Sequence, residues 1–126
     1  MPAPTSYEIE NCLAKLVNLA TKTDHTISIG KHAKARKRGQ LEIIDRAIYI
    51  LSNETVTAEV VKSLLDELAR KSNDIVTLRQ NIIQTRSMSD DSSLTDATLK
   101  YLAIRYNTVN RVYAIIDESL NNQEGL

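Results

Sequence analysis

The residues of this chain whose types and spacing could do chemistry are the cations of one short segment. Residues 31–38, which we call the basic stretch, carry five formal positive charges in eight residues. They lie within a run of seventeen residues, from His25 to Leu41, that contains no Asp or Glu. Lys and Arg without intervening acids can hold phosphate oxygens, whereas a surface that only keeps a protein soluble usually mixes both signs.

The remainder of the chain has the opposite charge. The whole sequence has 16 basic and 16 acidic residues, so removing the five cations of the basic stretch leaves 11 against 16, a net charge of −5. Such segregation lets a short segment act as a local anion site although the net charge is zero. Two interpretations stay open. The stretch is either a solvated charged face or a contact for the phosphate backbone of nucleic acid.

In the second interpretation the binding residues are those of the basic stretch other than its two alanines. No aromatic residue interleaves them and no recognition helix follows a tight turn, so the predicted contact does not read base sequence. The expected nucleic-acid-binding residues are Lys31, His32, Lys34, Arg36, Lys37 and Arg38.

Other chemistry finds little support in the sequence. His25 and His32 are seven residues apart, which is not the spacing that brings two ligands to one metal on a helix. Asp90, Asp91 and Asp96 lack the glycine and the closing glutamate of a calcium loop, so helix capping explains them better. No phosphate loop, nucleophile elbow or zinc-protease motif occurs. We therefore expect no enzyme activity, no metal and no cofactor.

The composition predicts that helices are the elements that position these residues. The chain has 126 residues, 42% of them hydrophobic, with three Gly, two Pro and no Phe or Trp. That is one domain with an aliphatic core and too few turn residues for many short strands. We expect a single all-α domain over residues 1–126, an antiparallel bundle of four helices, or five if residues 70–74 interrupt the third.

Localisation follows from the apolar pattern. No apolar run approaches the roughly 18 residues of a transmembrane helix, and the first residues lack the charged and apolar regions of a signal peptide. We expect a cytoplasmic protein without a membrane partner. The single Cys12 lies on an apolar helix face, where a buried small hydrophobe is the simplest interpretation.

A capping box and an apolar stripe predict the first helix, and a different pattern follows it. Thr5 and Glu8 fit a capping box, and apolar residues at spacings of three and four continue to about Lys22. Residues 23–30 alternate polar and apolar side chains, but no second strand exists to pair with them. We interpret them as a loop or as a helix start capped by Asp24.

The next apolar stripe runs from Leu41 to Leu51, directly after the basic stretch. A straight helix through Gly39 would place the cations of the stretch near the sector that the stripe buries. Either the helix breaks near Gly39, or it continues and its first half overhangs the bundle. In both cases we expect the basic stretch to meet solvent.

The capping residues and apolar periodicity of the C-terminal half predict two long helices. Thr55 or Thr57 should cap a helix that runs to about Ser87, and Ser93 or Thr95 should start the last one. The apolar arc of the last helix covers about half its circumference, wider than the ~100° of a one-sided surface helix. That helix is either central or meets a protein partner or a second copy of the chain. Its second apolar set, the predicted interface, is Tyr101, Ile104, Val112 and Ile115.

A basic stretch on a small, otherwise acidic helical body resembles the small helical subunits of ribonucleoprotein assemblies, such as those of CRISPR effectors. The resemblance is one of charge profile, and it implies a non-enzymatic subunit that contacts the backbone of RNA or DNA. The alternative rests on the wide apolar arc of the last helix. It is a protein-protein interaction module or adaptor with no nucleic-acid role.

Overall fold

The computed structural model describes residues 3–27, 29–30, 32–53, 55–86 and 92–121. This part of the chain forms four helices and contains no strand, which confirms the all-α class. Helix α3 is continuous across residues 70–74, so these residues do not divide it into two. Within the described residues no helix is long and apolar enough to cross a membrane. The helices are α1 (Ser6–His25), α2 (Ala33–Ser52), α3 (Ala58–Arg86) and α4 (Ser92–Leu120).

Threonine side chains cap the N-terminal ends of two of the helices. At α1, the amide of Glu8 donates to Oγ1 of Thr5 over 3.1 Å, and the amide of Thr5 donates to the Glu8 carboxylate over 2.8 Å. Both bonds of the predicted capping box are therefore present. At α3, the amide of Val60 donates to Oγ1 of Thr57 over 3.2 Å. Thr57, one of the two candidates, is the residue that caps this helix.

Other predicted boundaries are wrong by a few residues. Helix α1 continues past Lys22 to His25, so Asp24 lies in its last turn and does not cap a new helix. Helix α4 begins at Ser92, which places both predicted starting residues, Ser93 and Thr95, inside it. The acidic candidates Asp90 and Asp91 lie outside the described residues, whereas Asp96 lies within α4.

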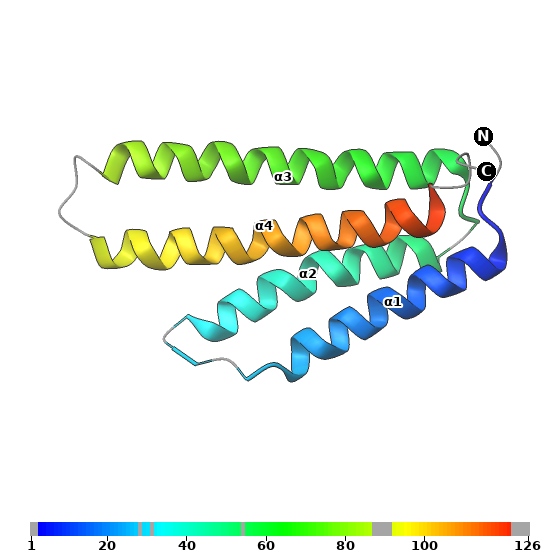
Figure 1. The fold of residues 1–126 in the computed structure, drawn as a ribbon, viewed down its shortest axis with the longest axis horizontal. Coiled ribbons are helices and arrows are strands. Elements are labelled where there is room, and N and C mark those ends of the chain that lie inside the picture. The colour runs from blue at the N-terminus through cyan, green and yellow to red at the C-terminus, as the bar shows by residue number, and fades with distance from the viewer. Residues whose placement is uncertain (1–2, 28, 31, 54, 87–91, 122–126) are drawn as a thin grey trace.

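Helix α4 occupies the centre of the bundle. It packs against each of the other three helices, and α1 also packs against α2. Figure 1 shows α3 along one side of α4 and the pair α1 and α2 on the other, with the chain reversing between α1 and α2 and again between α2 and α3. All four helices contribute aliphatic side chains to one core, whose fully buried members include Cys12, Leu16, Ile44, Leu51, Val109 and Ile116.

The wide apolar arc of α4 is explained by this central position. Val112 has no exposed surface and belongs to the core, so its prediction as an interface residue is wrong because neighbouring helices already cover it. Tyr101, Ile104 and Ile115 each keep part of their surface exposed, and Tyr101 and Ile115 also pack against the core. A role for these three residues in partner binding stays a prediction.

Candidate nucleic-acid interface

Helix α2 passes through Gly39 without a break, so the predicted alternative of a helix break near Gly39 is wrong. Gly39 is buried, and a Cβ at this position would lie 2.7 Å from the hydroxyl oxygen of Tyr101 and 3.2 Å from two carbon atoms of its ring. Arg105 of α4 also donates to the Gly39 carbonyl over 3.3 Å. The missing side chain therefore lets α4 approach the backbone of α2. Figure 1 shows α2 diverging from α4 toward its start.

The basic stretch forms the positive end of this helix. Residues 33–38 contain four cations, the first turn has no acidic residue, and the N-cap His32 makes no side-chain capping bond. A helix start carries partial positive charge on its amide groups, so Asp, Glu or a capping side chain is the favourable neighbour there. Here lysine and arginine add to that charge. The resulting potential attracts an anion such as phosphate.

Two of the cations bond the chain that precedes α2, one in the loop and one in the last turn of α1. Nη2 of Arg36 donates to the carbonyl of Ile29 over 3.3 Å, and Nζ of Lys37 donates to the carbonyl of Asp24 over 2.8 Å. Both side chains are partly exposed, and the expectation that the whole stretch meets solvent is wrong for Ala33, which is buried. Their partners are neutral carbonyl groups. The two positive charges are therefore positioned by these bonds but not cancelled.

The other described residues with polar side chains in the stretch are exposed to solvent. These are His32 and the cations Lys34 and Arg38, while Lys31 lies outside the described residues. Lys34 and Arg38 are four residues apart and therefore share one face of the helix. On the same side, one turn after Arg38, α2 carries the exposed Glu42. The positive surface therefore ends with Arg38.

Two isoleucines beside the basic stretch were missed by the sequence analysis. Ile27 and Ile29 precede α2 and are 85% and 84% exposed. The loop turns at Gly30, whose φ of +116° suits a residue without a side chain. The alternation of polar and apolar residues in this segment was visible in the sequence, but it did not indicate that the apolar ones would face water.

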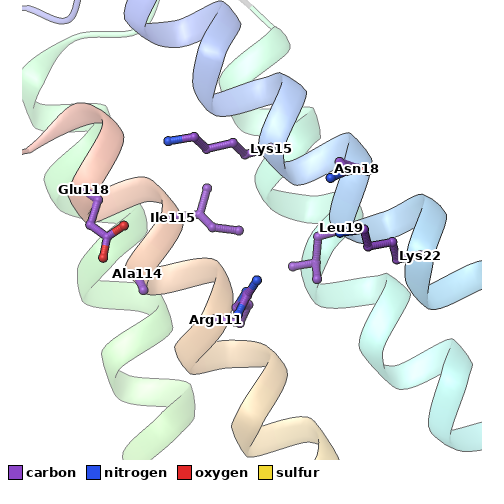
Figure 2. Close-up of a pocket in the computed structure, with 8 residues that line it drawn as sticks. All are labelled: Lys15, Asn18, Leu19, Lys22, Arg111, Ala114, Ile115 and Glu118. Atoms are coloured by element: carbon purple, nitrogen blue, oxygen red, sulfur yellow. The ribbon is translucent and has the colours of Figure 1, made fainter.

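A second group of cations, also not predicted, lines a groove between α1 and α4 (Figure 2). We call it the α1–α4 groove, and its volume is about 390 Å³. Because the two helices are far apart in the sequence, no local pattern connects the residues on its two sides. The groove is lined by Lys15, Asn18, Leu19 and Lys22 of α1 and by Arg111, Ala114, Ile115 and Glu118 of α4.

Metal and nucleophile chemistry have few candidates in the part of the chain that the structure describes. This part contains no group of three or more His, Cys, Asp or Glu side chains that could hold a metal ion. His25 and His32 are both exposed. Cys12 is buried, and burial raises the pKa of its thiol. A protonated, buried thiol is a packing group and a poor nucleophile.

The fold and the site together define an all-α protein in which helix α2 has a cationic start. No protein-family model matches the chain, and no curated protein or solved structure shows significant similarity to it. The functional conclusion therefore depends on the residues of this chain alone.

Proposed function

We propose that this protein is a non-enzymatic helical subunit that contacts the phosphate backbone of RNA or DNA through the basic stretch. Its place would be in a ribonucleoprotein assembly, in the manner of the small subunits of CRISPR effectors. The observation that carries the proposal is the group of four cations at the uncapped start of α2. Helix stability favours acidic residues at that position. Departures from such local rules are expected at functional sites.

The exposed pair in the basic stretch is the natural point of contact. Arg38 can bind a phosphate through two parallel hydrogen bonds, and Lys34 can act as a mobile point charge. Arg36 and Lys37 add to the field, while Arg36 bonds the preceding loop and Lys37 bonds the last turn of α1. Contacts to phosphates carry no direct base information, so the affinity should be similar for unrelated sequences of equal length.

The salt dependence of binding tests this proposal. Fluorescence anisotropy with a labelled oligonucleotide, measured at several salt concentrations, gives the slope of log K against log salt. In the variant Lys34→Gln with Arg38→Gln, the slope should become shallower by about 1.4 on single strands or about 1.8 on duplex, since each lost contact removes about 0.7 or about 0.9. The matched control, Lys62→Gln with Lys100→Gln, removes the same charge from exposed positions elsewhere and should leave the slope unchanged.

Three results would contradict the proposal. The first is the absence of oligonucleotide binding at low salt, and the second is an equal effect of the control variant. The third is binding to anionic lipid vesicles in place of the oligonucleotide, because the exposed Ile27 and Ile29 beside the cations would also suit a membrane surface.

A second candidate function, a protein-protein interaction module, is favoured by an apolar surface on another part of the molecule. A groove of about 350 Å³, the α3–α4 groove, lies between these two helices. Its walls include Ile75 and Tyr106 together with Val76 and Ile83, which are 38% and 48% exposed. Exposed apolar walls of this kind occur at protein interfaces. Light scattering of the purified protein tests for self-association through this surface.

A further inference from the structure

The α1–α4 groove combines charged walls with an apolar floor. Lys15 extends from α1 across Ile115, and Arg111 points from α4 toward α1 beside Leu19 (Figure 2). The floor residues Leu19 and Ile115 are half-buried, whereas the cations are exposed. The volume of about 390 Å³ falls within the range of about 300–1,000 Å³ that is typical of small-molecule sites.

The charges of the groove are unevenly distributed. Lys15, Lys22 and Arg111 form no ion pair with any residue of the described part of the chain. Glu118 lies at the end where Lys15 reaches over (Figure 2), so opposite charges face each other there. No carboxylate lines the groove near Lys22 and Arg111. This second end therefore keeps a net positive charge.

We propose that the α1–α4 groove binds a small phosphate ester. Its phosphate group is held by Arg111 and Lys22, and its organic part lies on Leu19, Ala114 and Ile115. The pairing of a planar guanidinium with an ammonium group is suited to a phosphate, because the first can donate two hydrogen bonds and the second adds a point charge. The amide of Asn18, on the same wall, supplies a further hydrogen-bonding group.

The placement of Glu118 favours a compact ligand over a polymer. A nucleic-acid strand would carry its next phosphate toward the end of the groove where Glu118 offsets the charge of Lys15, so that end offers the phosphate no net positive charge. The groove thus differs from the basic stretch, which contains no acidic residue. The site is independent of the proposed contact with nucleic acid and involves none of the same residues.

Nuclear magnetic resonance with adenosine 5′-monophosphate as the probe tests this inference. This compound is a phosphate ester with a flat organic body, and amide shifts of the full chain report where it binds. We expect saturable shifts at Lys22, Arg111 and Ile115, and binding that is weaker by about tenfold or more for adenosine, which lacks the charge-assisted hydrogen bonds of the phosphate. The variant Lys22→Gln with Arg111→Gln should weaken the nucleotide by about tenfold or more.

Controls separate this site from the basic stretch. Lys34→Gln with Arg38→Gln should leave the dissociation constant of the nucleotide unchanged, and Lys22→Gln with Arg111→Gln should leave the salt slope of the oligonucleotide unchanged. Nucleotide shifts confined to the start of α2, or an undiminished affinity in the groove variant, would overturn the assignment. Tighter binding of an oligoglutamate peptide at the groove would overturn it as well, since the occupant would then be an acidic protein segment.

Discussion

Gly39 lies inside a helix, where alanine would be more favourable by about 1 kcal/mol. The ring of Tyr101 occupies the space that the alanine side chain would need, with the hydroxyl oxygen 2.7 Å from the position of the added Cβ. Tyr101 is half-buried, so its ring can move only by giving up contacts with the core. The two residues should therefore be energetically coupled.

A double-mutant cycle measures this coupling. We expect Gly39→Ala to be more favourable in a Tyr101→Ala background than in the wild type by about 0.5–3 kcal/mol, the range found for residues in contact. Chemical denaturation followed by circular dichroism gives the four free energies of unfolding. The control background is Tyr49→Ala, because Tyr49 is 65% exposed and lies on another face of α2. Equal effects of Gly39→Ala in all three backgrounds would show that the ring imposes no constraint.

Between elements, one ion pair joins α2 to α3. Nε and Nη2 of Arg46 each donate to an oxygen of the Glu67 carboxylate over 2.7 Å. The hydrogen bonds from Arg46 hold the pKa of Glu67 below its ordinary value. A carboxyl group whose pKa is lowered by folding stabilises the folded state above its ordinary pKa, and this contribution disappears as the pH falls through the lowered value.

The pH dependence of stability tests the role of this pair. We expect Glu67→Gln to reduce the free energy of unfolding at pH 7 and to have a progressively smaller effect as the pH is lowered below about 4.5. Urea denaturation of both proteins across this pH range gives the difference. In an Arg46→Gln background the pH dependence of that difference should be much weaker. If the pH dependence persisted in the Arg46→Gln background, the group that lowers the pKa of Glu67 would not be Arg46.

For the molecule as a whole, the arrangement around α4 decides which apolar surface remains for a partner. Three helices cover the arc that suggested an interface, and Val112 lies entirely in the core. Val76 and Ile83 of α3 are more exposed than the predicted interface residues of α4, and they form one wall of the α3–α4 groove. Figure 1 shows the end of α3 and the start of α4 running past the loop between α1 and α2.

If the protein is an interaction module that pairs with itself, this groove is the surface involved. Light scattering should then give a dimer for the wild type and a monomer for Val76→Glu with Ile83→Glu. The midpoint of thermal unfolding measured at low protein concentration should stay close to that of the wild type, since both side chains are already exposed. The matched variant Leu78→Glu, which changes an exposed residue outside the groove, should remain dimeric. A wild-type monomer would exclude the homodimer.

Much of the fold follows from interactions between neighbours in the sequence. The capping box at Thr5 and the buried Cys12 were predicted, and the cap at Thr57 and the unbroken α3 were each one of two alternatives. Each depends on hydrogen bonds or on helical periodicity over three or four residues, which the chain specifies locally. The concentration of positive charge in residues 31–38 is a property of the same kind.

Tertiary packing decided the rest. The sequence could not show that a glycine is accommodated inside a continuous α2, because the group that fills the space of its missing side chain is Tyr101, a residue of a different helix. The same holds for Arg36 and Lys37, which are positioned by carbonyl groups of the preceding loop and of the last turn of α1. The α1–α4 groove exists only where the first helix packs against the last. Local periodicity shows which face of a helix is apolar, but only the packed structure shows which neighbours cover that face and which charges lie side by side.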